Sequence, residues 1–456
     1  MILSVSLISH RVYAEEISTK KDPNSEVKLS EALEMAVREN PELKATFQKK
    51  EEAQANTSRA VSGIFPTLSA FAQAELKQDA ASSPAALFGG DPYNSYGVGL
   101  SLEQSIFRGG RLWSGVDTAL KREEIAELQY SQKKRDLIEK VIETFYQVLL
   151  IDLEVKTHLD QQKIQEDLLK VSKRQLRFGT VRELEPLRIQ TKLALLVPRI
   201  EQSKNELQLQ AATLANLLGK NQTESITVAG NLKPSEPLMK LAERYRDLSV
   251  AESSLEEKLQ ALAIDEYGAS STFDFAQNYP QVLLNAQIQK LTTAKMELLS
   301  DDTTSWNVGL KLSIPLFTGL SSVFERRAIY AKTLELQNQE QKIKDDAALR
   351  RLRANRNLKL ALLRINTSEK TLEIAKRSLA VARKDHRLGR ATYTPVAEAS
   401  DSLVAAELDL HQSYFDLIHG LSSVCVAYGL GFDELLSAVH VDSGNLLDKP
   451  KETSER

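Results

Sequence analysis

The stretch LSLEQSIFRGGR, from Leu100 to Arg111, alternates apolar and polar residues and then places a Phe and two glycines before a long helical sequence. The stretch LKLSIPLFTGL, from Leu310 to Leu320, repeats this order 210 residues later. Alternation with a period of two indicates a β-strand with one apolar face, and glycine is typical of the turn that follows. One chain is therefore predicted to make the same strand-to-helix transition twice.

Two further segments repeat at the same interval. RFGTVRELEP contains Gly179 and RLGRATYTP contains Gly389, which are again 210 residues apart. A Leu-rich helix that ends at Gly219 corresponds to one that ends at Gly429. Such regular self-similarity indicates an internal duplication, and the period is far too long for a solenoid.

The duplication predicts the domain organisation. Each repeat should contain a helix, a hairpin of two strands and two very long helices, and the Gly, Pro, Asn and Ser between the repeats are typical of a linker. The predicted first repeat is 29–219, with its hairpin at 66–107 and long helices at 111–218; the linker is 220–237; the second repeat is 238–436, with its hairpin at 280–317 and long helices at 320–429.

The two ends of the chain have other predicted roles. The sequence MILSVSLISHRVYAEE has a short apolar run followed by a small-residue cleavage pattern, although it lacks a basic beginning. We expect residues 1–14 to be a truncated signal peptide. The polar, charged residues near the other end indicate a disordered tail at 437–456.

Composition excludes several classes of function. The 456 residues include 59 Lys and Arg against 62 Asp and Glu, so no nucleic-acid partner is expected. The single cysteine, Cys425, excludes an intramolecular disulfide, and its apolar surroundings indicate a small buried residue. No Cys/His cluster, P-loop, G-x-S-x-G or H-E-x-x-H motif occurs, so the sequence predicts no metal, no cofactor and no enzyme.

The long helical segments have the pattern of a coiled coil. From Arg111 to Arg177 there is no Pro and one Gly, and Val141, Val148 and Val155 recur every seven residues. Some 65 helical residues at about 1.5 Å rise give a rod of roughly 100 Å. The segment 323–387 is equally long and free of Pro and Gly. By themselves these rods would favour a coiled-coil spacer.

The strand segments favour a membrane instead. Four segments of about 9 to 11 residues alternate apolar with small or polar residues, which matches transmembrane strands in length and pattern. Phe71 is an exception on the polar side of the first segment. Half-buried strands of a soluble sheet also alternate, but amides and charges on the polar side suit a water-filled lumen. The leucines predicted to face lipid are Leu68, Leu100, Leu284 and Leu310, and the residues predicted to face water are Ser69, Ser101, Asn285 and Ser313.

Closure of these strands requires more than one chain. No window reaches the roughly 18 to 20 apolar residues of a membrane-spanning helix, so a role in a membrane would fall to strands. Four strands cannot close a barrel, and open sheet edges are not tolerated in lipid. Two chains give eight strands and a filled interior, whereas three give twelve strands and an opening. The expected fold is mainly α with a transmembrane β-barrel, built as a homotrimer that contributes four strands per chain.

At this point the motifs resemble a known family. LSLEQSIFRGGR and LSIPLFTG, with the upstream LSEALEMAVRENPEL and the turns RFG and RLG, look like those of the TolC-type outer-membrane efflux proteins. The resemblance runs from Leu29 to about Leu436. It implies a trimeric 12-stranded barrel in the cell outer membrane of a Gram-negative bacterium, continuing into a periplasmic α-helical barrel. It also implies a passive exit duct for efflux or type I secretion, which works with a periplasmic adaptor (membrane fusion) protein and an inner-membrane pump.

The resemblance further implies a gate at the periplasmic tip. In such proteins, acidic residues just after the second repeat's turn glycine line the closed entrance. Here those places fall on Pro395 and Glu398, and the place of an assisting Arg falls on Ala391, so at most one acidic ring remains. For Glu398, the role of a solvated helix residue stays equally open. The gate candidates are Glu398, His386 and Pro395, and the turn residues expected to contact the adaptor are Arg177, Gly179, Arg387 and Gly389.

Two alternatives remain at the level of the sequence. A soluble periplasmic coiled-coil adaptor or scaffold would have one long hairpin and compact β-domains, and a helical-barrel enzyme would need a site that no motif supplies. The cargo and the class of pump are not predicted, because a wide aqueous duct has no ligand-specific pocket.

Overall fold

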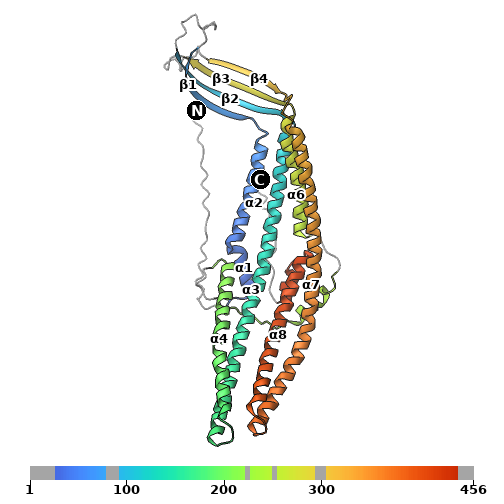
Figure 1. Ribbon diagram of the computed structural model, residues 1–456. Coiled ribbons are helices and arrows are strands. Elements are labelled where there is room, and N and C mark those ends of the chain that lie inside the picture. Colours follow the sequence, from blue (N-terminus) through green and yellow to red (C-terminus); the bar gives the residue numbers. More distant parts are fainter. Residues whose placement is uncertain (1–25, 79–91, 221–225, 249–253, 293–303, 440–456) are drawn as a thin grey trace. The chain divides into compact units, whose positions relative to one another are not determined.

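The described part of the chain is mainly helical, with one four-stranded antiparallel sheet (Figure 1). A computed structural model describes residues 26–78, 92–220, 226–248, 254–292 and 304–439. This confirms the predicted mainly α fold with four strands per chain. The predicted signal peptide at 1–14 lies outside the described residues, as does most of the predicted tail.

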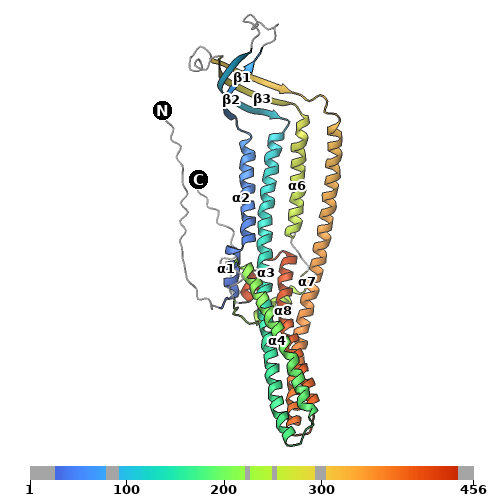
Figure 2. The same cartoon turned by 60° about the vertical axis from the view of Figure 1, so that its left-hand side comes forward.

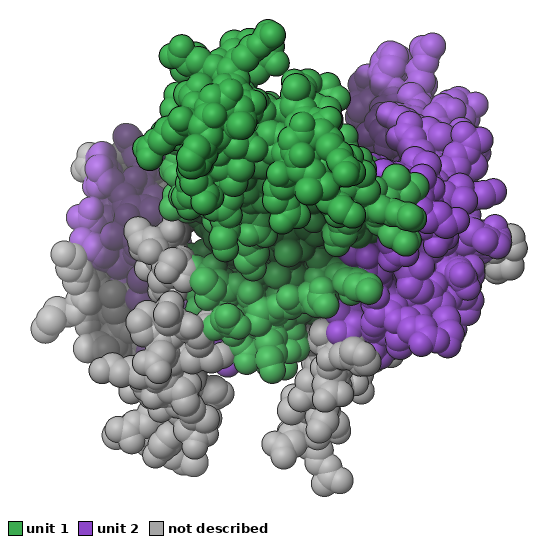
Figure 3. Space-filling model, turned by 90° about the horizontal axis from the view of Figure 1, so that it is seen from below, with its two compact units in different colours: residues 1–36, 141–233, 372–411 green, residues 37–140, 234–371, 412–456 purple. Residues whose placement is uncertain are grey.

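The chain divides into two compact units, which Figure 3 distinguishes by colour. Unit 1 comprises residues 1–36, 141–233 and 372–411, and unit 2 comprises residues 37–140, 234–371 and 412–456. The longest helices, α3 (Arg111–Arg177) and α7 (Ser321–Arg387), each contribute to both units. Both have 67 residues, as the absence of Pro and the scarcity of Gly predicted.

Unit 2 contains the sheet and the helices that continue from it. In Figure 2, α2 (Pro41–Ser62), the first part of α3 and α6 (Leu255–Phe275) run alongside one another next to the sheet. A break separates α2 from α1 (Leu29–Glu39), because Pro41 cannot continue a helix and Asn40 caps the new one. The Asn40 Oδ1 atom accepts a hydrogen bond from the Leu43 N–H at 2.9 Å.

The remaining helices complete the two units. Helix α4 (Leu184–Leu217) belongs to unit 1, and α8 (Tyr393–Tyr428) begins there. Helices α5 (Glu236–Tyr245) and α9 (Asp433–Ala438) belong to unit 2, and α9 extends two residues into the region predicted as tail. Cys425 is fully buried in unit 2, and burial raises the pKa of its thiol to about 12. The sequence interpretation of Cys425 as a small buried residue is therefore confirmed.

The sheet has the strand order β1-β2-β3-β4, so the two predicted hairpins lie side by side. The strands are β1 (Thr67–Lys77), β2 (Tyr93–Arg108), β3 (Gln281–Thr292) and β4 (Thr304–Ser313). Strand β2 has 16 residues and a β-bulge between Ser105 and Phe107, where it pairs with β3. The bulge allows β2 to continue beyond the predicted alternation, because it changes which side chains share a face.

The polar side of the sheet accommodates the exceptional Phe71 through a glycine. Phe71 is paired with Gly99 across β1 and β2. A Cβ atom at Gly99 would lie 2.7 Å from the Phe71 Cζ atom and 2.6 Å from the Ile288 carbonyl oxygen. The aromatic ring therefore occupies the space that a side chain at position 99 would need.

Both sheet-to-helix junctions take the same left-handed backbone path. Gly109 and Gly110 have φ of 61° and 88°, and their counterparts 210 residues later, Gly319 and Leu320, both have φ of 65°. Among the described residues, Leu320 is the one residue other than Gly with positive φ. A left-handed conformation costs an L-residue roughly 1–2 kcal/mol, so the second junction keeps the path at a cost in strain.

We expect Gly110→Ala to destabilise the protein by about 1 kcal/mol, because an L-residue there would be strained. A Cβ at Gly110 would meet nothing within 4 Å, so steric contact would not contribute. Gly268→Ala in α6 is the matched control, since that Cβ also has open space but the backbone is helical. Gly268→Ala should stabilise the protein by roughly 0.5–1 kcal/mol. Thermal unfolding in detergent, followed by circular dichroism, compares the two; shifts in the same direction would contradict the assigned junction conformation.

Candidate functional site

The four leucines predicted to contact lipid lie on one face of the sheet. Residues paired across antiparallel strands share a face, and residues two apart on one strand do so as well. Leu68 is opposite Leu102, which lies two residues from Leu100, and Leu284 is opposite Leu310. The exposed fraction is 68% for Leu68 and 71% for Leu310. Such a continuous exposed apolar face requires an apolar environment or a partner.

The opposite face is mainly polar, with Phe71 and Leu283 among its apolar exceptions. One row across the four strands consists of Thr67, Glu103, Asn285 and Gly309, and the next consists of Ser69, Ser101, Gln287 and Asn307. Lys311, on β4, follows on the same face, opposite Leu283. These side chains are suited to contact with water, and the two faces of the sheet differ in polarity as the alternation predicted.

An exposed aromatic and apolar band lies where the strands meet the helices, and the sequence alone does not predict it. Phe107 and Phe317, which stand at the two transitions from strand to helix, are both exposed. The structure adds neighbours that are also large, apolar and exposed: Phe65, Ile106, Trp113 and Leu316. Aromatic residues at strand ends are characteristic of a membrane–water boundary. Their position at the end of each alternating segment was the signal that could have identified the band.

The two predicted tip turns belong to unit 1 and have the same conformation. Gly179 and Gly389 have φ of 68° and 70°, a left-handed conformation that favours glycine. The Thr180 N–H donates to the Gln175 carbonyl at 3.0 Å, and the Arg390 N–H donates to the Asp385 carbonyl at 2.9 Å. This Schellman arrangement ends α3 and α7 in the same way. The exposed residues at these turns include Arg177, Phe178, Gly179, Arg387, Leu388 and Gly389.

A cavity of about 670 Å³ separates the two turns and is lined by residues of both. His386 lies at its wall but is itself 2% exposed. Its Nδ1–H donates to the Ala391 carbonyl at 3.1 Å, and Nδ1 is 3.8 Å from Oε1 of Glu185. His386 therefore stabilises the turn at Gly389 from inside, next to the Glu185 carboxylate on α4.

The other two gate candidates, Pro395 and Glu398, lie on the face of α8 that points away from the core. Pro395 and Glu398 are exposed, whereas Tyr393, Val396 and Ala399 are buried. Helical spacing accounts for the difference, because residues three and six positions apart share the inner face. The buried residues of this core, which joins α3, α4, α7 and α8 within unit 1, are Leu168, Ile189, Leu379, Tyr393, Val396 and Ala399.

Polar contacts between the helix pair α3–α4 and helix α8 were not predicted from the sequence. Asp401 on α8 forms an ion pair with Lys192 on α4 and accepts a hydrogen bond from the Gln161 amide at 3.1 Å. The Tyr393 hydroxyl donates to Gln165 Oε1 at 2.7 Å. Burial, together with the charge of Asp401, raises the pKa of Tyr393 to about 12, so its hydroxyl stays a donor. These contacts hold α3 and α4 against α8.

Neither a metal cluster nor a membrane-spanning helix is found in the described ranges. Those residues contain no group of three or more His, Cys, Asp or Glu side chains placed to hold a metal ion. No described helix is both long enough and apolar enough to span a membrane.

Comparisons with known proteins find a matching family and solved structures with a similar fold. The sequence matches the family "Outer membrane efflux protein" over residues 32–220 and 250–413. No curated protein sequence matches the chain.

Solved structures similar to the chain come from several bacteria. The outer membrane protein VceC from Vibrio cholerae is 18% identical, with a TM-score of 0.76 over 89% of this chain and 96% of that chain. A membrane protein from Pseudomonas aeruginosa is 17% identical, with a TM-score of 0.77 over 90% and 92%. The CmeC outer membrane channel from Campylobacter jejuni is 14% identical, with a TM-score of 0.75 over 94% and 95%. At these identities the likeness establishes the fold.

We expect cysteines on the two faces of the sheet to differ in reactivity. In a background with Cys425→Ala, a water-soluble thiol reagent should modify the polar face several-fold faster than the apolar face, because lipid excludes the reagent. Positions on the same strand serve as matched controls. The apolar-face variants are Leu68→Cys, Leu100→Cys, Leu284→Cys and Leu310→Cys, and the polar-face variants are Ser69→Cys, Ser101→Cys, Asn285→Cys and Ser313→Cys. Faster modification of the leucine set, measured by mass spectrometry of protein in lipid vesicles, would contradict the assignment of faces.

Proposed function

Because the chain belongs to the outer membrane efflux protein family, we propose that it forms the exit duct of a tripartite efflux or type I secretion system. The chain is accordingly a protein of the cell outer membrane of a Gram-negative bacterium. The family match does not support the alternative of a soluble periplasmic adaptor or scaffold. The members of this family are conduits and not enzymes, so the proposal includes no catalytic step.

One observation carries the proposal: a single chain supplies four strands with one apolar and one polar face, and the sheet is open at β1 and β4. The apolar face suits lipid and the polar face suits a water-filled lumen. Open edges are costly in lipid, so β1 of one chain must pair with β4 of another. Three chains give twelve strands, which is enough for an opening, whereas eight strands leave an interior filled by side chains.

The long helices supply the rest of the duct in this proposal. Each of α3 and α7 has 67 residues, which corresponds to about 100 Å of helix. With the strands in the membrane, these helices extend into the periplasm and end at the turns of Gly179 and Gly389. Those turns expose Phe178 and Leu388, which have exposed fractions of 82% and 55% and give an adaptor protein apolar contacts. Transport is then passive in the duct, and an inner-membrane pump supplies the energy.

The assembly itself is the first test. Detergent-extracted protein should have the mass of three 50.9 kDa chains after correction for bound detergent, and it should conduct ions in planar bilayers. Both results follow from closure of the sheet between chains. A monomer of 50.9 kDa that stays in solution without detergent would contradict the proposal.

The tip assignment gives a second test. Glu398→Gln should lower the permeability ratio of K⁺ to Cl⁻, because the trimer would lose three carboxylates near the axis of a narrow entrance. Glu373→Gln is the control, since Glu373 is also exposed but lies on α7, 14 residues before its end at Arg387. The ratio comes from the reversal potential under a KCl gradient.

Crosslinking tests the adaptor contact separately. Cysteines at Phe178 and Leu388 should crosslink to the co-expressed adaptor, whereas a cysteine at Leu363, which is 60% exposed in unit 2, should not. Crosslinks only at position 363 would contradict the assignment of the turns as the adaptor contact. In the selectivity experiment, an unchanged permeability ratio in Glu398→Gln would contradict the assignment of Glu398 to the gate.

A further inference from the structure

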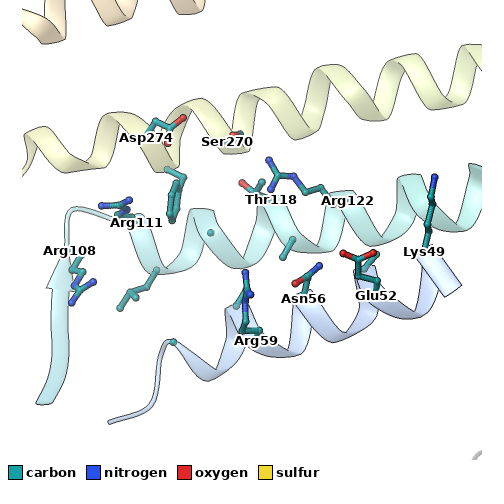
Figure 4. A pocket seen from close by; sticks show the side chains of 17 residues that line it. Lys49, Glu52, Asn56, Arg59, Arg108, Arg111, Thr118, Arg122, Ser270 and Asp274 are labelled. Atoms are coloured by element: carbon teal, nitrogen blue, oxygen red, sulfur yellow. The ribbon is translucent and has the colours of Figure 1, made fainter. Parts of the chain in front are cut away.

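A basic groove lies in unit 2 where the sheet meets the helices (Figure 4). It has a volume of about 920 Å³, and residues of α2, α3, α6 and the end of β2 line it. Its acidic lining residues are Glu52 and Asp274. Its cationic lining residues are Lys49, Arg59, Arg108, Arg111 and Arg122. In a chain whose net charge is -3, this excess of cations at one site is a local feature.

Two of these cations are held in fixed positions. The Arg111 guanidinium lies 4.4 Å from the centroid of the Phe273 ring, in a cation–π contact. Gly115 allows the ring this position, because a Cβ atom there would lie 3.0 Å from Phe273. On the next turns of α3, Arg122 Nε is 2.7 Å from Glu266 Oε1. The stacked arginine leaves its N–H groups available, whereas Arg122 is already paired with a carboxylate.

The cations without such a carboxylate make the groove available to an anion. Within the described residues, no ion pair within 4.0 Å joins Lys49, Arg59 or Arg111 to an acidic side chain. Figure 4 shows Arg59 projecting from α2 toward α3, and Arg111 at the start of α3. Arginine presents several N–H donors in one plane, which suits carboxylate, sulfonate and phosphate groups.

The groove opens on the side of the polar face of the sheet. Arg108 Nη2 is 3.9 Å from Glu103 Oε1, and Glu103 belongs to a polar row. On α3, the lining residues Arg111, Gly115 and Arg122 share one stripe by helical spacing. Trp113 lies on the opposite stripe and is 71% exposed, as part of the aromatic and apolar band. Polar face and groove are therefore on one side, and the membrane-boundary residues are on the other.

We propose that this groove binds anionic groups of cargo on the wall of the duct. The inference rests on the proposed function, because that function makes the polar side of the sheet the lumen. The cargo it fits carries a carboxylate, sulfonate or phosphate, and a trimer would present three such grooves around the path. Because the interaction is electrostatic and partly exposed to water, it depends strongly on salt.

A trisulfonated fluorescent dye, pyranine, is the probe for the test. Fluorescence anisotropy should show saturable binding to the detergent-solubilised trimer, weakened by raising the ionic strength from about 0.05 M to about 0.5 M. Arg59→Gln/Arg111→Gln should bind the dye about tenfold more weakly, since two charge contacts are lost. Arg59→Gln alone, which leaves the Phe273 stack intact, should show a smaller loss in the same direction. Lys121→Gln on α3, outside the groove lining, is the matched control and should bind like the unchanged protein.

Three results would overturn the inference. The first is equal dye binding by the double variant and the Lys121→Gln control, with trimer mass and helix content unchanged. The second is retention of phosphatidylglycerol, measured by native mass spectrometry, that depends on Arg59 and Arg111 while the dye does not bind, because the groove would then hold a lipid headgroup. The third is dye binding that does not saturate and is the same for all variants at low salt, because the dye would then be held by nonspecific attraction. The proposed function fails separately, if the protein is not a trimer or does not conduct.

Discussion

The outer strands of the sheet, β1 and β4, each leave one row of backbone N–H and C=O groups without a strand partner among the described residues. In hydrocarbon, each unpaired group costs several kilocalories per mole, yet the apolar face that contains Leu68 and Leu310 is itself suited to hydrocarbon. Pairing β1 of one chain with β4 of the next meets both demands. This contact joins different surfaces of identical chains, so it repeats head to tail and becomes stable only when the ring closes. The sheet of one chain is therefore incomplete without further copies.

The internal duplication explains how a single chain supplies two equivalent hairpins for such a ring. What the two halves share is backbone path more than residue identity. The junctions at Gly109 and Gly319, and the helix ends at Gly179 and Gly389, have the same left-handed conformations. The path is retained even where the favourable residue is lost, as at Leu320. A strained leucine at that position indicates that the direction in which a helix leaves the sheet matters more than the local free energy of the turn.

Local patterns predicted the elements well because their causes are local. Absence of Pro predicted α3 and α7, alternation predicted the strands, and glycine indicated both tip turns. The contacts of the candidate site depend on residues that are distant in the sequence. The ion pair of Lys192 with Asp401 joins α4 to α8, and the hydrogen bond of Tyr393 to Gln165 joins α8 to α3. His386 resembles any polar helix residue until the turn folds over it. The exceptional Phe71 likewise needed the strand register, which places a glycine opposite its ring.

The basic groove illustrates the same limit and also what a conduit requires of a binding site. Its cations lie between positions 49 and 122, and each by itself resembles the solvated face of a helix. Their exposure keeps each interaction weak: the side chains of Arg108 and Arg122 are 38% and 63% exposed, and exposed ion pairs contribute roughly 0–1 kcal/mol. A deeply buried site of the same charge would bind an anion tightly and obstruct the path. Conduction needs binding that is favourable enough for entry and weak enough for release, and partly exposed arginines at the duct wall meet both conditions.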